Sequence, residues 1–476
     1  MTADPRAAAV ILAAGAASRF GGDKVFAPVA GRSLLEHVLG AARQARLDPI
    51  VVVLGPKTDA GSGVDLGDAT VVRNPHPADG LSSSLRLGLA ALETHGPGAG
   101  TSRRVEAAVI LLGDQPLVRP AVIEALLAAD RHPGRTVVVP RYEAGGGPNP
   151  TLVLRPAWHL ADGLAGDRGF GPVIAAHPEL VVEVPVDGTN PDVDTPADLA
   201  AVAWAAQVRA NRDQVDRVRE VGDGDFYAST TSLFRADPRR PDEDDATLAA
   251  RRGLARPGER WLDIGAGAGR YALPLALALE PDGEVIAVDP SPAMLAGLRE
   301  DTATHGIGNL RIVEGRWPLA PGTLPSPAAD VALIANVGYD IEAICPFVDA
   351  MEAAVTRLCV AVMMERTPAS VAEPFWPRVH GEPRIPLPAL PEFVALLRSR
   401  GRDPVVRTVH REQRSFPDRD TALGFLRRQT WVEPDGARDR ILQAELDRRM
   451  VPTADGGVTF RHIHDLVAGI VIWRMS

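Results

Sequence analysis

The stretch VILAAGAASRFGGDK, from Val10 to Lys24, decides the fold of the first half of this chain. It starts as an apolar run typical of a buried strand, continues through glycine, alanine and serine, and ends near two cations. A glycine-rich turn after the first strand of a parallel sheet lets backbone N–H groups approach phosphates, and the N-terminus of the next helix favours the same negative charge. We therefore predict that the turn Leu12 to Gly15 holds phosphates, and that Arg19 and Lys24 balance the charge of a transfer. The alternative is a plain strand-to-helix turn with surface cations.

Length and composition limit the function classes. A chain of 476 residues is too long for one core, since domains have roughly 100 to 200 residues, and two or three domains are expected. A hydrophobic fraction of 45% with 24% charged residues is typical of globular chains, and a formal net charge of -10 argues against a nucleic-acid-binding surface. No apolar run reaches the roughly 18 to 20 residues of a membrane span, so we expect neither membrane insertion nor export.

Cysteine usage indicates a reducing compartment. The chain has two cysteines, Cys345 and Cys359, without CxxC spacing or nearby histidine pairs. Neither a disulfide framework nor a cysteine zinc site is indicated by this pattern. We therefore expect the protein in the cytoplasm.

Two series of short apolar runs, separated by helix-length segments, divide the chain. Because the runs are mostly apolar on both faces, they predict largely parallel sheets covered by helices. We expect an α/β chain of two Rossmann-like three-layer αβα domains, in residues 1–205 and 251–476, joined by a connecting helix and linker in the polar segment 206–250. The runs are AAVILAAG, PIVVVLG, TVVRN, AAVILLGD, TVVVPRY and LVVEVPV in the first series, and RWLDIGAG, GEVIAVD, LRIVEG, ADVALIAN, CVAVMME and AGIVIWRM in the second.

Two carboxylates of the first domain are candidate metal ligands. Asp114 ends the run AAVILLGDQP, and a carboxylate at the carboxyl end of a parallel strand faces the crevice where such sheets bind ligands. Asp194 lies in NPDVDTPADL, just ahead of a Thr-Pro helix start. Oxygen ligands of this kind suit Mg2+, which also binds phosphate oxygens and water. The alternative is that Asp192, Asp194 and Thr195 only cap the following helix.

An ordered set of motifs within about residues 7–203 resembles a known family. The motifs are LAAGAASRFGGDK, NPHPADGLSSSLRLGL, LLGDQP, GGGPNPTLVLR, LAGDRGFGPVI and DVDTPADL. In this order they resemble the molybdenum cofactor cytidylyltransferase-like family, within the MobA-like nucleotidyltransferases, which implies a nucleotidyltransferase fold. The resemblance assigns nucleotide binding to Leu12, Ala13, Ala14, Gly15, Arg19, Lys24, Asp79, Gly80, Ser82 and Ser84, Mg2+ binding to Asp114 and Asp194, and acceptor binding to Gly147, Asn149, Asp167 and Gly169.

Two positions depart from the family pattern, and a third position, Ala14, bears on which nucleotide base is used. Ala17 stands where many members have Ser, and Asn149 stands where Gly or His is common. Neither departure removes a charge that phosphate transfer needs. The LAAG form with Ala14 is similar to the CTP-using branch of the family, whereas the guanylyl-using branch carries LAGG.

The chemistry implied is attack of a substrate phosphate, on molybdopterin cofactor, at the α-phosphorus of CTP, with pyrophosphate leaving. Arg19, Lys24 and Asp114 would be the catalytic residues, through charge stabilisation and positioning. An attacking phosphate is already anionic and needs no general base. Transfer to a sugar or alcohol phosphate is an alternative.

The second domain carries the motif RWLDIGAGAGRYALPLALAL. It has Arg270 where a dinucleotide fingerprint would have glycine. The form D-x-G-x-G-x-G resembles motif I of class I S-adenosylmethionine (SAM) methyltransferases, and the likeness covers about residues 226–476. A further acidic residue, twenty positions after the last glycine, is placed to accept hydrogen bonds from the ribose hydroxyls. The resemblance assigns SAM binding to Asp263, Gly265, Gly267, Gly269, Asp289, Arg316, Trp317 and Asn336. It also implies that the segment Asn336 to Tyr339 borders the methyl-transfer site.

Three features around this second site stay open. Arg316 stands where the family often has an acidic residue, so adenine would be held by backbone contacts and by Trp317, or else Trp317 is ordinary core. His380, in the Pro-rich segment 373–393 with Trp376 and Arg384, is a candidate base, although a structural contact is the preferred interpretation. The two histidines of FRHIHDL, His462 and His464, lack an evident third metal ligand.

The sequence thus predicts a fused enzyme: an Mg2+-dependent cytidylyltransferase followed by a methyltransferase whose acceptor is unknown. A SAM-binding regulatory module without transfer activity is a rival for the second half. An adaptor that delivers cofactor to a molybdoenzyme partner is a third alternative. Small-molecule substrates are otherwise the expected partners, with no nucleic acid and no membrane.

Overall fold

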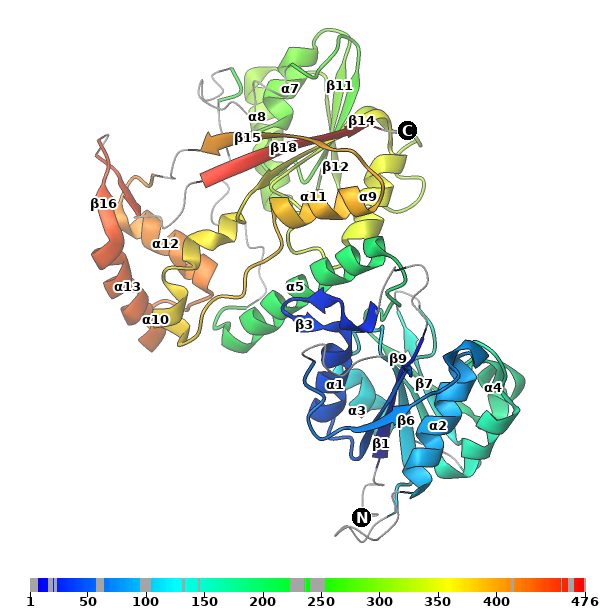
Figure 1. Cartoon of the computed structure of the whole chain (residues 1–476). Helices are drawn as coiled ribbons and strands as arrows, with labels where there is room; N and C mark the ends of the chain where they lie inside the picture. Colours follow the sequence, from blue (N-terminus) through cyan, green and yellow to red (C-terminus); the bar gives the residue numbers. More distant parts are fainter. Residues whose placement is uncertain are drawn as a thin grey trace. The chain divides into compact units, whose positions relative to one another are not determined.

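The chain folds into two compact units, Met1–Ala203 and Trp204–Ser476, each of which is described by itself (Figure 1). None of the described helices is long and apolar enough to cross a membrane. The computed structural model describes residues 7–15, 20, 24–56, 64–94, 104–130, 133–143, 146–222, 235, 237–239, 253–411, 415–454, 456–460 and 466–474.

The first unit is built on a seven-stranded sheet in the order β5-β4-β1-β6-β8-β7-β9. All neighbours are parallel except β8, which is antiparallel to β6 and β7. The sequence does not predict β8, because its four residues follow a glycine- and proline-rich loop. The strands are β1 (Ala7–Ala13), β4 (Ile50–Leu54), β5 (Thr70–Arg73), β6 (Ala107–Leu112), β7 (Val137–Tyr142), β8 (Thr151–Leu154) and β9 (Val181–Val186).

Helices cover both faces of this sheet and complete three layers. α1 (Leu34–Gln44) and α3 (Pro120–Ala128) bury leucines and valines against one face, and α2 (Leu81–Thr94) and the 3-10 helix η3 (Arg155–Gly163) pack against the other. Ser33 caps α1 in a capping box with Glu36. Shorter elements are η1 (Lys24–Phe26), β2 (Pro28–Val29), β3 (Arg32–Ser33), η2 (Pro77–Asp79), α4 (Gly171–Ala176) and η4 (Pro178–Leu180).

The second unit has its own seven-stranded sheet, in the order β12-β11-β10-β13-β14-β18-β15. β18 is antiparallel to both of its neighbours, and the other pairs are parallel. The sequence does not predict β15, because this edge strand is mostly solvent-exposed and carries arginines and a histidine. The strands are β10 (Arg260–Ile264), β11 (Glu284–Asp289), β12 (Leu310–Glu314), β13 (Ala329–Ala335), β14 (Val355–Met364), β15 (Val405–Arg411) and β18 (Leu466–Arg474).

Helices again lie on both faces of the second sheet. α7 (Ala272–Leu279) and α8 (Pro292–His305) share one apolar cluster with the strands. α9 (Ile344–Ala353) packs on β14, and α11 (Leu390–Ser399) packs on β18. The three-layer α/β architecture expected from the sequence is therefore confirmed for both units.

A single long helix, α5 (Pro196–Val218), begins in the first unit and continues into the second. From Trp204 onward its side chains belong to the second unit. Trp204 is 1% exposed, donates to Ile341 O at 2.9 Å and meets Phe393 edge to face. Arg209 pairs with Glu342. The second compact unit thus starts at Trp204, whereas the sequence predicts that its second domain starts at residue 251.

The insert, residues 365–404 and 412–465, follows the carboxyl ends of β14 and β15. Its described part has a separate core in which Phe375, Phe416 and Phe460 pack with leucines of two helices. Since both segments leave the sheet at the carboxyl ends of parallel strands, they lie on the edge where α/β sheets bind ligands. Its elements are η6 (Pro368–Ala372), α10 (Trp376–His380), α12 (Arg419–Thr430), α13 (Ala437–Arg449), β16 (Met450–Pro452) and β17 (Val458–Phe460), together with α11.

A buried ion pair joins the two long helices of the insert and predicts acid sensitivity. Asp439, whose side chain is 0% exposed, accepts from Arg427 at 2.8 and 2.6 Å. Arg427 lowers the pKa of Asp439 to about 2, with further help from the Asp435 N–H and Gln443. In the unfolded chain the pKa of an Asp carboxyl is about 3.9. This stabilisation is therefore present above that value and is lost as the pH falls toward about 2.

Urea unfolding at pH 7, 5, 4 and 3 tests this expectation. Asp439→Asn is expected to destabilise the insert at pH 7 by roughly 3–5 kcal/mol, since it leaves Arg427 without its buried partner. The variant should also lose part of the decline in stability between pH 5 and 3. An unchanged pH profile in the variant would assign the acid sensitivity to other groups.

Candidate active sites of the two units

The ends of β1 and β6 meet closely at the carboxyl edge of the first sheet. Gly113 N donates to Leu12 O at 2.9 Å, and a Cβ on Gly113 would lie 2.8 Å from the Ala13 side chain. Glycine is therefore required where β6 ends. This contact places Asp114 directly beside the predicted phosphate turn, in which Ala14 is buried and Gly15 is exposed.

Lys24 joins the two predicted metal ligands. Its Nζ lies 2.7 Å from Asp114 Oδ2 and 2.7 Å from Asp194 Oδ1. The Lys24 side chain is 13% exposed, Asp114 is 20% exposed and Asp194 is 52% exposed. Burial alone would lower the pKa of Lys24, but the two carboxylates outweigh it and raise that pKa. The structure thus brings together three residues that the sequence predicts for one site.

Asp194 is not the cap of α5. Thr195 and Asp198 form the cap themselves, since the Thr195 hydroxyl accepts from Asp198 N at 3.2 Å and Asp198 accepts from Thr195 N at 2.8 Å. Val193 N donates to Asp114 O at 3.0 Å, which holds this segment against the end of β6. The capping alternative therefore applies to Thr195 and leaves Asp194 for the site.

A third carboxylate, Asp192, stands at the same edge. Gln115 Nε2 donates to Asp192 Oδ1 at 2.8 Å, and Asn190 Nδ2 donates to Gln115 Oε1 at 3.1 Å. Asp192 is exposed as a residue, but partial desolvation of its carboxyl and the nearby Asp114 raise its pKa. The sequence treats Asp192 only as a capping candidate and does not single out Gln115 or Asn190. The one indication of Gln115 and Asn190 in the sequence is that they lie inside the motifs GDQP and NPDVDTP.

The carboxylates fit a divalent cation that also binds phosphates. Asp114 and Asp194 already share one positive charge, the Lys24 ammonium, so their spacing suits a cation held by both. Mg2+ is commonly held by one or two carboxylates together with substrate phosphates and water. Among the residues that the structure describes, no group of three or more His, Cys, Asp or Glu side chains is arranged to hold a metal. Asp114 and Asp194, which converge on Lys24, are the carboxylates that would hold such a cation.

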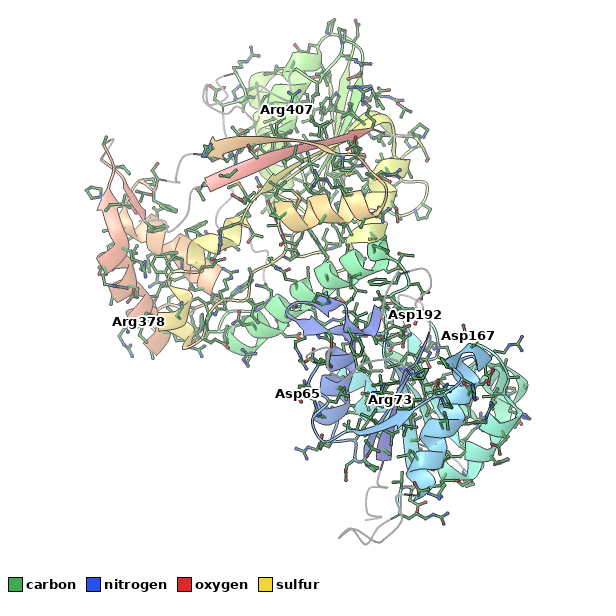
Figure 2. All side chains as sticks on the ribbon, viewed as in Figure 1. Asp65, Arg73, Asp167, Asp192, Arg378 and Arg407 are labelled. Atoms are coloured by element: carbon green, nitrogen blue, oxygen red, sulfur yellow. The ribbon has the colours of Figure 1, made fainter. Side chains whose placement is uncertain are left out.

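The segment predicted to line the base and ribose contacts the loop predicted to face the acceptor. Gly80 has φ +89, and a Cβ there would overlap the backbone of Gly166. Ser82 N donates to Gly166 O at 3.2 Å. Only glycine at position 80 permits this approach, which brings the nucleotide segment next to Asp167. In Figure 2 the labelled Asp167 and Asp192 lie on the same side of the first unit.

The remaining predicted residues of this site differ in exposure. Asp79, Gly147 and Asp167 are exposed, and Asn149 and Gly169 are partly buried. Ser82 and Ser84 are buried, and Ser84 Oγ accepts from Asn74 Nδ2 at 2.9 Å. Their contacts with substrates stay predictions. Arg19 and Ala17 lie outside the described residues.

In the second unit, the glycines of the predicted SAM loop have backbone conformations that favour glycine. Gly265, Gly267 and Gly269 have φ of +75, +55 and +89. A Cβ on Gly265 would lie 2.5 Å from Val337. Gly267 N donates to Asp289 Oδ2 at 2.8 Å, so the acidic residue at the end of β11 holds the loop at the end of β10.

Six of the eight predicted SAM residues lie on or beside three neighbouring strands, and the other two, Arg316 and Trp317, follow β12. Asp263 is 1% exposed on β10, and Asp289 on β11 also accepts from Ser291 N at 2.8 Å. Asn336 follows β13 and accepts from Tyr339 Oη at 3.3 Å. Since β10, β11 and β13 are adjacent and parallel, their carboxyl ends form one edge.

Two aromatic residues also lie at this edge: Tyr271, which the sequence does not single out, and Tyr339, the last residue of the segment expected to border the methyl-transfer site. Tyr271 follows the glycine loop and accepts a hydrogen bond from Arg411, at the end of β15, at 2.8 Å. Tyr339 is 6% exposed and accepts from Met364 N at 2.7 Å, and burial raises its pKa. Tyr271 lies inside the glycine-loop motif, but the sequence does not indicate its contact with Arg411, which the fold brings together from 140 residues away.

The structure decides between some of the alternatives that the sequence left open for this unit. Arg316 is exposed, and Trp317 Nε1 donates to Phe347 O at 3.3 Å, which anchors the indole on α9. His380 Nε2 donates to Thr430 O at 2.9 Å and packs on Trp376, so its contact is structural. Arg384 stacks over Trp376, and burial lowers its pKa to about 10. His462 and His464 lie outside the described residues.

A cavity of about 540 Å³ opens between α2 and η3 of the first unit. It is lined by arginines, acidic residues and Trp158. None of the predicted site residues lines it. The cavity therefore does not mark the predicted reaction site.

Comparisons with known proteins bear on both units. Residues 9–181 match the family model described as MobA-like NTP transferase domain, and residues 262–357 match the one described as methyltransferase domain.

Three curated relatives illustrate the range of substrates. "Phosphoenolpyruvate guanylyltransferase" of Sanguibacter keddieii is 35% identical over 33% of this chain and 54% of its own length. "3-deoxy-manno-octulosonate cytidylyltransferase" of Rhodospirillum centenum is 30% identical over 36% of this chain and 64% of its own length. "Probable molybdenum cofactor guanylyltransferase" of Thermococcus gammatolerans is 27% identical over 28% and 62%. The chain thus spans 54% to 64% of these relatives, whose names differ in nucleotide and acceptor.

Proposed function

Because residues 9–181 are a MobA-like NTP transferase domain and residues 262–357 are a methyltransferase domain, we propose that this chain is a bifunctional enzyme. Its first activity transfers a cytidylyl group from CTP to a phosphate acceptor, molybdopterin cofactor. Its second activity transfers the methyl group of SAM to a further acceptor. The convergence of Asp114 and Asp194 on Lys24 carries the first proposal, since it sets a shared cation beside the phosphate turn.

Different residues of the first site have different roles in nucleotidyl transfer. An oxygen of the acceptor phosphate forms a bond to the α-phosphorus of CTP, the bond to the β-phosphate oxygen breaks, and pyrophosphate leaves with its electron pair. Backbone N–H groups of Leu12 to Gly15 hold phosphate oxygens. Asp114 and Asp194 would hold Mg2+, which supplies charge stabilisation at the phosphates when bound.

Lys24 has a second position in this reaction. In the structure its ammonium neutralises Asp114 and Asp194. If those carboxylates held a divalent cation, Lys24 would be free to pair with phosphate oxygens of the nucleotide, where its charge would stabilise the leaving pyrophosphate. The Lys24 side chain is only 13% exposed, so its ammonium needs a negatively charged partner in both states.

The choice of CTP rests on the sequence of the phosphate turn. The LAAG form with Ala14 supports it, because this form is similar to the CTP-using branch. The names of the relatives include both guanylyl and cytidylyl transfer, and their acceptors include phosphoenolpyruvate and the molybdenum cofactor. A sugar or alcohol phosphate is the second candidate acceptor, favoured by the relative named for phosphoenolpyruvate, which is also a small molecule that carries a phosphate.

Pyrophosphate release with Mg2+, molybdopterin cofactor and each of CTP, GTP, ATP and UTP tests this proposal. We expect release with CTP, at a rate at least about tenfold above the other nucleotides. Release with GTP alone would overturn the choice of base and keep the reaction class. No release with any nucleotide would overturn the molybdopterin acceptor, and the same assay would then be run with sugar and alcohol phosphates.

The geometry of the second unit supports SAM as its ligand. Asp289 closes the glycine loop through its hydrogen bond with Gly267. The insert begins after β14, which runs parallel to β13 and β10, so we propose that residues of the insert contact the methyl acceptor. SAM binding with formation of S-adenosylhomocysteine in cell extract would support methyl transfer. Tight SAM binding without that product would favour a regulatory module instead.

The setting of both activities is proposed to be the cytoplasm. This proposal rests on the sequence, whose two cysteines, Cys345 and Cys359, have no disulfide or zinc-site spacing. The expected partners are small-molecule substrates, and a stable complex with a molybdoenzyme would favour the adaptor alternative.

A further inference from the structure

A row of three hydrogen-bonded polar side chains lies beside Asp114. Asn190 Nδ2 donates to Gln115 Oε1 at 3.1 Å, and Gln115 Nε2 donates to Asp192 Oδ1 at 2.8 Å. Asn190 is 3% exposed and Gln115 is 4% exposed. A flipped Gln115 amide would set oxygen against the carboxylate and NH2 against NH2, so the row has one orientation.

This row connects the two loops that carry the metal ligands. Gln115 is the neighbour of Asp114 at the end of β6, and Asp192 stands two residues before Asp194. The Val193 N–H donates to Asp114 O at 3.0 Å and adds a second connection. The buried amides therefore set where the Asp192 carboxylate lies relative to Asp114.

Asp192 lies outside the pair of carboxylates that shares the lysine. Lys24 makes its ion pairs with Asp114 and Asp194, and the described residues form no three-ligand metal group. A third carboxylate held beside such a pair contributes in a different way. Mg2+ keeps several waters when proteins bind it, and these waters donate hydrogen bonds to nearby carboxylates.

We propose that Asp192 is an outer-sphere ligand of the divalent cation, with Gln115 and Asn190 as its positioning residues. Its carboxylate accepts hydrogen bonds from the hydration water of a cation held by Asp114 and Asp194. Fixed groups of this kind typically change metal affinity by about 10- to 100-fold when they are removed. This inference rests on the proposed function, since it needs the metal to bind at Asp114.

The test is Mn2+ affinity of the full chain, measured from the electron paramagnetic resonance of free Mn2+ with CTP present and no acceptor. We expect Asp192→Asn and Gln115→Leu each to weaken Mn2+ binding about 10- to 100-fold. The double variant should bind Mn2+ no more weakly than the single variant with the lower Mn2+ affinity, because Gln115 acts through Asp192. Glu143→Gln, which removes one negative charge from an exposed position of the same unit, is the control.

Each outcome has a definite meaning. Asp192→Asn within twofold of the Glu143→Gln control would overturn the inference, and so would additive effects in the double variant. Circular dichroism establishes folding of each variant, and Gln115→Met replaces Gln115→Leu if the latter does not fold. Wild-type Mn2+ binding that is absent, or insensitive to Asp114→Ala, would instead overturn the proposed function.

Discussion

Asp114→Ala is expected to abolish pyrophosphate release, with a fall in rate of at least about 10³-fold, while SAM binding stays at the wild-type level. Asp114 supplies one of the two carboxylates that share a cation, and loss of several kcal/mol of charge stabilisation gives a factor of this size. SAM binding should persist because Asp263 and Asp289 belong to the other compact unit. Pyrophosphate release and SAM calorimetry on the same preparation measure both.

The control for this variant is Glu143→Gln, an exposed carboxylate of the same unit, which should keep the wild-type rate. Loss of both pyrophosphate release and SAM binding in a folded Asp114→Ala variant would contradict the independence of the two units. A rate within tenfold of wild type would contradict the placement of the metal.

Trp204→Ala is expected to destabilise the methyltransferase unit by about 3–5 kcal/mol, the usual cost of removing a buried tryptophan. Trp204 is 1% exposed, donates to Ile341 O and packs on Phe393. Ile341 lies five residues after Asn336, so SAM affinity should fall as well. Urea unfolding with and without SAM measures both effects.

Two variants on the same helix separate packing from other causes. Trp204→Phe keeps an aromatic ring but loses the indole N–H and part of the buried ring volume, so a cost of about 1–3 kcal/mol, smaller than that of Trp204→Ala, is expected. Asp213→Ala, at an exposed position, should stay within about 0.5 kcal/mol of wild type. A small effect of Trp204→Ala would mean that this part of α5 is only a connection between units.

Much of the fold was predictable because the signals are local. Each series of apolar runs reports strands buried on both faces, and the glycine turns follow the first strand of each sheet. The sequence misses one strand in each of the two large sheets. β8 has four residues directly after a glycine- and proline-rich loop, and β15 is a polar edge strand, so neither was recognised as a separate apolar run.

The candidate sites were predictable to the extent that their residues stand next to strand ends. Asp114, Asp263 and Asp289 each lie at or beside the end of an apolar run, which is why their shared edges could be inferred. Gln115 and Asn190 lie inside quoted motifs, but nothing in the sequence indicates what their side chains contact. Their roles depend on partners that are distant in the chain, and a single sequence does not report those partners.

The sequence by itself determined the two α/β units, the glycine turns and the strand-end carboxylates, because spacing along the chain encodes each of them. The tertiary structure alone decided that Lys24 bridges Asp114 and Asp194, that Asp192 is held by Gln115, and that α5 from Trp204 onward belongs to the second unit. These arrangements arise from contacts between segments far apart in the chain. Burial and hydrogen-bond pairing select such contacts only once the sheets have formed.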